Sequence, residues 1–311
     1  MILHPPYQVL LYYHYTPVED APAYAAEHHS LCKELDLLGR ILIAHEGING
    51  TVSGTFDQTN RYMEMLHADP RFAEMQFKVD AATSHAFHKL IVKFRPEIVK
   101  LGLENDVDPR KDTGKRLSPA EFHEALQRDD VLIIDARNDY EFQVGHFRNA
   151  ICPPLKTFNQ FPQWIRENLA HAKDKPILTY CTGGIRCEKF SAFLLSEGFS
   201  DVSQLDGGIV TYGKDPEVQG HLFDGQCYVF DERVTVPINH TPDATVVGHC
   251  LYCGTPMERY VNCANLGCKT QFLCCIPCEF ASRRSCSLAC QSAENHEFDL
   301  STAGTDKAFY R

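Results

Sequence analysis

Nine of the fourteen cysteines in this 311-residue chain fall between positions 250 and 290. The nine are Cys250, Cys253, Cys263, Cys268, Cys274, Cys275, Cys278, Cys286 and Cys290. The start of the chain lacks the basic and apolar segments of a secretion signal, so we expect a reducing compartment in which disulfides are rare. Paired cysteines at short spacings then favour metal binding over disulfides. This stretch is therefore expected to fold around metal.

Eight of these cysteines form four closely spaced pairs. The pairs are Cys250 and Cys253, Cys263 and Cys268, Cys275 and Cys278, and Cys286 and Cys290. Eight thiolates are what two tetrahedral zinc ions require, so we predict two structural zinc ions with Cys274 as the spare cysteine. The spacing does not say which pairs share an ion. Reduced thiols or an adventitious disulfide are the alternative to zinc.

The charge balance limits how the chain can bind nucleic acid. It carries 30 Lys and Arg against 41 Asp and Glu, a formal net charge of -11. Such a surface does not attract a phosphate backbone as a whole, so a nucleic-acid partner requires a local basic patch. Near the cysteines, the candidates are Arg259, Lys269, Arg283 and Arg284. No apolar run approaches the roughly 18 residues that cross a bilayer, and we expect a cytoplasmic protein without a membrane partner.

Hydrophobic patterns divide the chain into parts of different fold class. We predict a ferredoxin-like α+β domain over residues 1–100, a linker over 101–117, a parallel α/β domain over 118–215, and a small Cys-rich zinc-binding module with a polar tail over 216–311. The expected fold class is therefore a multidomain combination of α/β and α+β units.

The N-terminal part alternates strand and helix patterns. Strands are expected at residues 9–15, 40–44, 49–53, 75–79 and 88–95. One helix is expected over residues 24–38, with Gly39 as its stop, and a second around 62–66, capped by Thr55 or Asp57. The order β-α-β-β-α-β with one additional strand predicts a ferredoxin-like sheet with helices on one face.

Residues 118–215 show a different rhythm. Short apolar runs at 131–134, 150–151, 176–180 and 202–205 are separated by helical patterns, among them 121–127 and 188–195. Ser118 stands before Pro119, as expected at the start of a helix. This alternation is typical of a parallel sheet.

The most informative segment is the loop between the predicted strand at 176–180 and the helix that follows. It consists of Cys181, Thr182, Gly183, Gly184, Ile185 and Arg186, with Cys187 next. Two successive glycines let backbone N–H groups turn inward to form an anion-binding nest, and the helix N-terminus adds partial positive charge. Such a nest would stabilise the thiolate of Cys181, which we predict to be the catalytic nucleophile. The alternative is a buried, inert cysteine at a strand end. Cys187 is either a resolving partner or simply a small helix residue.

Residues 118–213 resemble a rhodanese domain. The resemblance rests on the thiol loop and on an upstream segment at 134–151 that contains Asp135, Arg137, Glu141 and His146. It implies a persulfide or an attacking thiolate at Cys181. It also implies a structural ion pair between Asp135 and Arg137, and mainly architectural roles for Glu141 and His146. Only four residues separate Cys181 from Arg186, one fewer than in the related phosphatases, which favours sulfur-sized or planar targets over phosphate esters.

The segments on either side of this domain narrow the resemblance. Upstream, residues 44–54 read Ala-His-Glu-Gly-Ile-Asn-Gly-Thr-Val-Ser-Gly, and downstream the cysteine stretch includes Tyr-Val-Asn-Cys-Ala-Asn at 260–265. The three-part layout resembles the oxygen-dependent tRNA uridine hydroxylase family over nearly the whole chain. The resemblance implies tRNA as the partner, molecular oxygen as co-substrate, and conversion of the wobble uridine at position 34 to 5-hydroxyuridine. The sequence has no flavin or nicotinamide signature.

Two roles of Cys181 in such a reaction remain open. Its thiolate adds to C6 of uracil and makes C5 electron-rich, or a persulfide or oxidised form of the cysteine takes part in oxygen transfer. Two rival functions also remain open: a thiosulfate or persulfide sulfurtransferase, and a non-catalytic zinc-dependent scaffold.

The Gly-rich segment at 44–54 is a candidate for contact with RNA. His45, Asn49 and Thr51 offer hydrogen bonds, and the His45 ring offers a stacking face. The alternative is a hairpin with turn chemistry only.

A second candidate for RNA contact is the predicted strand at 88–95. Period-2 geometry places Lys89, Lys93 and Arg95 on one face of this strand. That face is either a phosphate-tracking stripe or a plain solvated surface. Lys189, in the first turns of the helix after the thiol loop, could orient an anion, but we expect it to be solvated.

Overall fold

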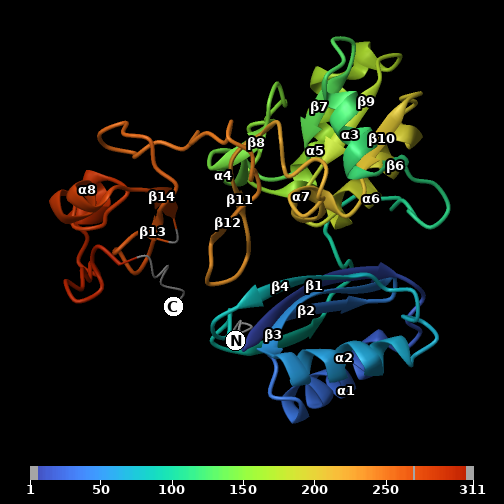
Figure 1. Ribbon diagram of the computed structural model, residues 1–311, viewed down its shortest axis with the longest axis horizontal. Coiled ribbons are helices and arrows are strands. Elements are labelled where there is room, and N and C mark those ends of the chain that lie inside the picture. The colour runs from blue at the N-terminus through green and yellow to red at the C-terminus, as the bar shows by residue number, and fades with distance from the viewer. Residues whose placement is uncertain (1–5, 269, 306–311) are drawn as a thin grey trace.

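A computed structural model describes residues 6–268 and 270–305 of the chain. Figure 1 shows a sheet with two helices beneath it, an α/β unit above it, and a C-terminal lobe to one side. This mixed, multidomain architecture confirms the predicted fold class. No described helix is both long enough and apolar enough to cross a bilayer.

The N-terminal part is one twisted sheet with helices on one face. Its elements are β1 (Tyr7–Tyr15), α1 (Ala21–Glu34), β2 (Leu38–Ala44), β3 (Gly47–Thr55), α2 (Phe56–His67), β4 (Phe77–Ala82) and β5 (Leu90–Phe94). The strands lie in the order β4-β1-β3-β2-β5, antiparallel except for the pair β2 and β5. This is the predicted ferredoxin-like sheet, with β5 as the additional strand.

Side-chain alternation gives this sheet one apolar face and one face turned away from the helices. Leu10 and Tyr12 on β1 pack with α1 and α2 in a buried core, whereas Leu11, between them, points to the opposite face. Helix α2 begins after Thr55, whose side-chain oxygen accepts a hydrogen bond from the Gln58 backbone N–H. The predicted cap at Thr55 is therefore present.

The first helix is shorter than predicted. Helix α1 ends at Glu34 and Leu38 already begins β2, so Gly39 is not a helix stop. Gly39 is a strand residue that lies very close to β3, and a Cβ at this position would be 2.3 Å from the Thr51 carbonyl oxygen. The glycine permits close approach of two strands, which the helical spacing of the preceding leucines concealed.

The α/β unit is built around a parallel sheet. Its elements are β6 (Lys115–Leu117), α3 (Pro119–Leu126), β7 (Leu132–Asp135), α4 (Asp139–Phe142), β8 (Gly145–Phe147), η1 (Phe158–Gln160), α5 (Phe161–Asn168), η2 (Ala170–Ala172), β9 (Ile177–Tyr180), α6 (Ile185–Ser196), β10 (Val202–Leu205) and α7 (Gly208–Tyr212). Strands β6, β10, β9 and β7 are neighbours in that order and all run parallel. Ser118 caps α3, as predicted.

Two segments of this unit differ from the predictions. The apolar run at 150–151 does not form a strand, and only a single bridge joins Ile151 to Ile134. The span predicted as a linker contains β6, which pairs with β10, and Leu101, which is fully buried in the core of the α/β unit. A polar composition therefore concealed both a short strand and an anchoring apolar side chain.

The C-terminal part begins within the α/β unit and ends in the separate lobe. Its elements are β11 (Phe223–Tyr228), β12 (Thr235–Pro237), β13 (Tyr260–Asn262), β14 (Gln271–Leu273), α8 (Ile276–Ala281) and α9 (Leu288–Gln291). Strand β11 pairs with β8 of the α/β unit and with β12, whereas β13 and β14 form a hairpin in the lobe. Strand β11 therefore ties the start of the C-terminal segment to the α/β unit.

Lys189 on α6 ties the α/β unit to the N-terminal sheet. Its side chain is fully buried, and its Nζ atom lies 2.9 Å from carboxylate oxygens of Glu46 and Glu97 and 2.6 Å from one of Asp106. The prediction that Lys189 is solvated is wrong. Three carboxylates from segments distant in sequence surround this ammonium group, an arrangement that local sequence does not reveal.

Candidate active site and metal clusters

The thiol loop lies between β9 and α6 of the α/β unit. The Gly184 backbone N–H donates a hydrogen bond to Cys181 Sγ over 3.1 Å. Gly184 has φ = +101°, a conformation that glycine adopts readily and that turns this amide toward the sulfur. The structure therefore forms the predicted nest around a cysteine that is only 1% exposed.

This environment favours the thiolate of Cys181. Burial by itself raises the pKa of the thiol, but a hydrogen bond from Cys187 and the positive charge of Arg186 oppose that effect. Hydrogen bonds from the Cys187 and Arg186 backbone N–H groups lower the pKa of the Cys181 thiol further. The net result is a pKa of about 6 for Cys181, well below that of a free thiol.

Cys187 is the immediate neighbour of this sulfur. It is fully buried, and burial together with its hydrogen bond to Cys181 raises its pKa. Cys187 therefore remains a thiol and donates to the Cys181 thiolate. The two readings of Cys187 as a resolving partner or a small helix residue both stay compatible with this contact.

Arg186 is fixed by a buried carboxylate. Its two terminal nitrogens each lie 2.7 Å from an oxygen of Glu141, which is fully buried. Burial opposes ionisation of Glu141, but the charge of Arg186 holds the pKa of this carboxyl below its usual range. Glu141 therefore sets the position of the loop arginine. Nearby, the predicted ion pair between Asp135 and Arg137 is confirmed, with 2.7 Å between the closest atoms and both side chains buried.

The face of the N-terminal sheet that α1 and α2 leave uncovered lies over the thiol loop. An added Cβ on Gly183 would be 2.9 Å from Leu11 Cδ2, and one on Gly184 would be 2.8 Å from the Tyr13 hydroxyl oxygen. Both sheet residues are on β1. We call this covering face of the N-terminal sheet the lid. The lid explains why the sulfur is buried although its loop lies at the end of a strand.

Lys78 is a functional candidate that the sequence analysis missed. It stands directly opposite Leu11 in the β1–β4 pairing, and it lines a cavity of about 30 Å³ together with Thr182 of the loop. Burial lowers the pKa of Lys78, and the negative charge of Cys181 is the leading influence in the other direction. The ammonium group therefore adds positive charge close to the thiolate. Its place in a strand of alternating polarity is the only sequence signal that could have pointed to it.

The residues predicted to contact RNA in the Gly-rich segment take different positions. Thr51 lines the same small cavity as Lys78 and so lies near the thiol loop. His45 is exposed at the β2–β3 turn, with Nδ1 3.0 Å from the Val18 carbonyl oxygen. Asn49 donates a hydrogen bond to the Ile98 carbonyl oxygen over 3.0 Å, which ties its amide to the backbone.

The basic residues predicted at the other sheet edge are not brought to the thiol. Lys89, Lys93 and Arg95 are exposed at or beside β5, the strand at the edge opposite β4. With about 4.8 Å between neighbouring strands, the edges of this five-stranded sheet are about 19 Å apart. A role of these three residues in RNA binding stays a prediction.

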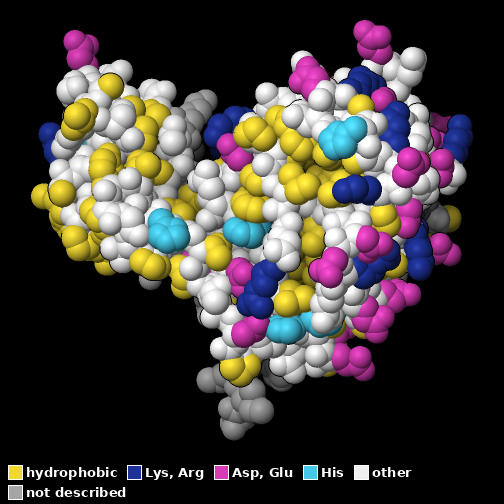
Figure 2. Space-filling model, turned by 90° about the horizontal axis from the view of Figure 1, so that it is seen from above, with side chains coloured by type: hydrophobic (Ala, Val, Ile, Leu, Met, Phe, Trp, Pro, Cys, Tyr) yellow, Lys and Arg dark blue, Asp and Glu magenta, His cyan; other side chains and the backbone are white. Residues whose placement is uncertain are grey.

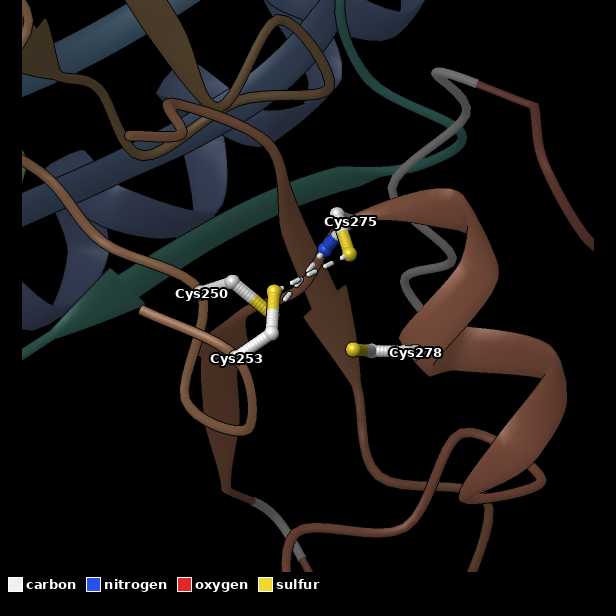
Figure 3. A group of neighbouring side chains, drawn as sticks. All are labelled: Cys250, Cys253, Cys275 and Cys278. Carbon is white, nitrogen blue, oxygen red and sulfur yellow. Dashed lines mark hydrogen bonds between the residues drawn. The ribbon is translucent and has the colours of Figure 1, made fainter. Parts of the chain in front are cut away.

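The structure brings the eight paired cysteines of the C-terminal stretch together in two groups. Cluster 1 consists of Cys250, Cys253, Cys275 and Cys278, and cluster 2 of Cys263, Cys268, Cys286 and Cys290. Within each group the four sulfurs lie within 4.8 Å of one another. In Figure 3 the sulfurs of cluster 1 converge, two from a loop and two from the start of α8. The pairs alternate along the chain, which is the connectivity that spacing left open.

The sulfur geometry fits a metal ion. The distance between Sγ atoms is 3.7 Å for Cys253 and Cys275 in cluster 1 and for Cys268 and Cys286 in cluster 2. Four sulfurs in a tetrahedron at about 2.3 Å from zinc are about 3.8 Å apart. A disulfide requires about 2.05 Å, so these contacts are not disulfides. Both clusters can therefore hold a metal ion.

Two of the basic residues suggested near the clusters form ion pairs within the lobe. Arg259 and Arg284 both pair with the buried carboxylate of Glu279, at 2.7 and 2.6 Å, and a contact of these arginines with RNA stays a prediction. Arg283 is exposed, and Lys269 lies outside the described residues. In Figure 2, Lys and Arg side chains are interspersed with Asp and Glu instead of forming a continuous stripe.

Comparison with known proteins extends over the same three parts. Residues 7–98 match the UPF0176 acylphosphatase-like domain, residues 118–215 the rhodanese-like domain, and residues 224–291 the rhodanese C-terminal family. The chain is 59% identical over 290 residues to the tRNA uridine(34) hydroxylase of Bacillus pumilus, an alignment that covers 93% of this chain and 90% of that protein. The chain belongs to the tRNA uridine(34) hydroxylase family. A member from Bacillus cytotoxicus is 57% identical, with 94% of this chain and 90% of that protein covered.

The regions that match known families include the thiol loop and both cysteine clusters. The rhodanese-like match contains the loop, and the rhodanese C-terminal match contains all eight cluster cysteines. The resemblance inferred from the flanking motifs is therefore confirmed. Lys78 and the other sheet residues that cover the loop lie within the acylphosphatase-like match.

Proposed function

We propose that this protein hydroxylates uridine 34 of tRNA at C5, with the Cys181 thiolate as the reactive group. The observation that carries the proposal is an alignment with named tRNA uridine(34) hydroxylases over more than nine-tenths of the chain. The low pKa of Cys181 supports the choice of this residue, because a thiolate is the reactive form of cysteine.

Molecular oxygen is the proposed co-substrate. Inserting one oxygen atom into the C5–H bond leaves the second atom to be reduced to water, which takes two protons and two electrons from an external two-electron reductant such as a thiol. If the thiolate adds to C6, C5 becomes electron-rich and can attack an oxidant; loss of the C5 proton and expulsion of the Cys181 thiolate from C6 then restore the C5–C6 double bond. If Cys181 carries a persulfide or an oxidised sulfur, the sulfur itself takes part in oxygen transfer. The nest of backbone N–H groups stabilises negative charge on sulfur in either case.

The target base must reach a sulfur that the N-terminal sheet covers. The cavity beside the loop holds only about 30 Å³, room for water molecules but not for a pyrimidine ring. We therefore infer that the sheet moves away from the loop when tRNA binds. Closure over the bound base would then exclude water from the reaction.

We further propose that each cysteine cluster holds one zinc ion with a structural role. Zinc favours four sulfur ligands in a closed tetrahedral site, and all four positions are filled by cysteine in both clusters. Eight thiolates and two Zn²⁺ ions contribute -8 + 4 = -4 to the formal charge. The metal therefore folds the lobe without making it attractive to phosphate. Because tRNA is the substrate, we place the protein in the cytoplasm.

The test is nucleoside mass spectrometry of tRNA incubated with the purified protein under oxygen. We expect 5-hydroxyuridine with the native protein and none with Cys181→Ala. Cys152→Ala is the matched control and keeps full activity, because this half-buried thiol has a pKa raised by burial to about 12. Full activity of Cys181→Ala would disprove the proposed role.

The same preparations distinguish the two roles of sulfur. An RNA with 5-fluorouridine at position 34 traps a covalent adduct on Cys181 if the thiolate adds to C6. An intact-protein mass with one additional sulfur atom identifies the persulfide instead. Rapid formation of thiocyanate from thiosulfate and cyanide, without any change in tRNA nucleosides, would favour a sulfurtransferase.

A further inference from the structure

A large cavity lies between the α/β unit and the Cys-rich lobe. It holds about 900 Å³, a volume typical of ligand-binding clefts. The aromatic rings of Tyr140, Tyr228 and Phe230 line it, together with the amide side chains of Asn262, Asn265 and Gln271, and the Tyr228 hydroxyl donates a hydrogen bond to Gln271 Oε1 over 2.6 Å. In Figure 2 the lobe is set apart from the body of the molecule by an indentation. We call this cavity the aromatic groove.

The three rings form a connected group. The Tyr228 ring centroid is 5.3 Å from that of Tyr140 and 5.3 Å from that of Phe230, and both contacts are edge-to-face. Phe230 is 50% exposed. Its free ring surface is therefore available to stack against a planar ligand.

The groove leads to the thiol loop. Phe230 lines both the aromatic groove and the small cavity that contains Lys78 and Thr182. The guanidinium carbon of Arg186 lies 5.9 Å from the centroid of the Phe230 ring. Phe230 thus stands at the junction between the large cleft and the covered reactive sulfur.

Cluster 2 contributes to the lining of the groove. Cys263 and Cys268 line the groove, and the Asn265 amide donates a hydrogen bond to Cys290 Sγ over 3.5 Å. Asn265 is therefore part of the fold around this cluster. Its position depends on the same four sulfurs that we propose to hold zinc.

The charges in the groove argue against a site for phosphate alone. Among the described residues, two cations line it, Lys156, paired with Asp139 at 2.6 Å, and Arg284, paired with Glu279 at 2.6 Å, and the carboxylates of Glu297 and Asp299 line it as well. An exposed aromatic face in a wide cleft is what an unpaired nucleobase requires, because every base has a planar face that can stack on an aromatic ring.

We propose that the aromatic groove binds the unpaired anticodon-loop nucleotides next to the target uridine, with Phe230 as a stacking platform. This inference rests on the proposed function, because it takes tRNA as the substrate. It assigns to the cleft between the α/β unit and the lobe the task of holding the loop while the target base approaches Cys181.

The first test measures binding of a 17-nucleotide anticodon stem-loop to the full-length Cys181→Ala protein with and without Phe230→Ala. Stacking on one base contributes about 1–3 kcal/mol, so we expect affinity to fall about 5- to 150-fold. Phe56→Ala is the matched control, because this phenylalanine on α2 is 54% exposed and remote from the groove. We expect Phe56→Ala to bind the stem-loop like its parent protein. Equal affinity of the Phe230→Ala and parent proteins would overturn the proposal.

Further variants separate stacking from a general structural effect. Phe230→Tyr should retain binding, whereas Phe230→Leu, which is apolar but not aromatic, should lose it. A duplex RNA without unpaired nucleotides should bind the parent and Phe230→Ala proteins equally. If Phe230→Leu binds as tightly as the parent protein, or if duplex affinity falls as much as stem-loop affinity, the groove does not recognise unpaired bases.

Binding and catalysis fail in different ways in these experiments. Absence of 5-hydroxyuridine with the native protein, combined with a specific loss of stem-loop affinity in Phe230→Ala, would refute the proposed function and retain the groove. Normal hydroxylation with an unchanged KM for the stem-loop in Phe230→Ala would refute the groove and retain the function. The two conclusions are therefore tested separately.

Discussion

The molecule uses cysteine sulfur in two contrasting environments. Cys181 is a single buried sulfur beside a backbone N–H group and a neighbouring thiol. Clusters 1 and 2 instead gather four sulfurs each in the lobe, where Cys253 is exposed, Cys250 and Cys263 are buried and the others are half-buried. The first environment stabilises one negative charge with protein groups. The second places four ligands at distances that suit a shared cation.

This difference assigns a reactive role to Cys181 and a structural role to the sulfurs of clusters 1 and 2. One sulfur with protein-derived stabilisation keeps a free lone pair for chemistry, and the rest of the fold controls access to it. Sulfurs that all coordinate one closed metal site have no open position and contribute folding energy instead. The contrast predicts that perturbations of one environment leave the other largely intact.

The largest effect is expected from removing metal. Apparent binding energies of structural zinc reach about 10–16 kcal/mol at neutral pH, so a strong chelator should unfold the lobe. Hydrogen exchange should show loss of protection over residues 250–290, with protection over 176–196 retained. Cys253→Ser should lose one of two metal equivalents, while Cys274→Ala, at the buried cysteine outside both clusters, should lose none. Unchanged exchange over 250–290 after chelation would refute the structural role.

A smaller effect is expected from removing the carboxylate beneath the thiol loop. Glu141→Gln leaves the buried Arg186 charge without its partner, which we expect to cost about 3–5 kcal/mol of unfolding free energy. Urea denaturation measures this loss. Glu124→Gln is the control, because Glu124 is exposed on α3 and its replacement should change stability little.

The pH dependence of the Glu141 contribution has a definite sign. Because its pKa is lowered in the folded protein, the stabilisation is present above the pKa of an unfolded glutamate. It is lost as the pH falls through the lower folded value. The difference in stability between native protein and Glu141→Gln should therefore shrink in acid. A difference that grows in acid would contradict the ion pair.

The smallest effect is expected at Lys78. Lys78→Met removes a positive charge near the thiolate, so the pKa of Cys181 should rise, by about one pH unit or less. The pH dependence of Cys181 alkylation measures this change. Lys93→Met is the matched control, because Lys93 is an exposed lysine on the strand at the opposite edge of the sheet. An equal effect of both replacements would show that the lid does not influence the sulfur.

The sequence predicted those features that depend on local spacing. Cysteine pairs indicated metal ligands, and two glycines before a helix indicated a nest at Cys181. Alternation of strands and helices predicted both the ferredoxin-like sheet and the parallel sheet. The cap at Thr55 also follows from local hydrogen-bond chemistry.

The features that the sequence did not predict depend on contacts between distant segments. Lys189 was expected in solvent, yet it meets three carboxylates at the boundary between two domains. Lys78 approaches the thiol loop only because the N-terminal sheet covers the α/β unit. The partners of these lysines are between 83 and 143 residues away in the sequence, and no local pattern marks them.

The most direct test of the account is the pH dependence of Cys181 alkylation, followed by mass spectrometry of its peptide in the native protein. The reagent reaches Cys181 only when the lid opens. The extent of opening changes the size of the alkylation rate but not the pH at which that rate is half-maximal. We predict a half-maximal rate near pH 6, with a plateau above that value and a tenfold decrease per pH unit below it. Cys152, whose pKa is raised to about 12, is the internal reference and should still react faster with each increase in pH at pH 9. A midpoint for Cys181 at pH 8.5 or above, as for a free thiol, would contradict a sulfur held ionised by its loop.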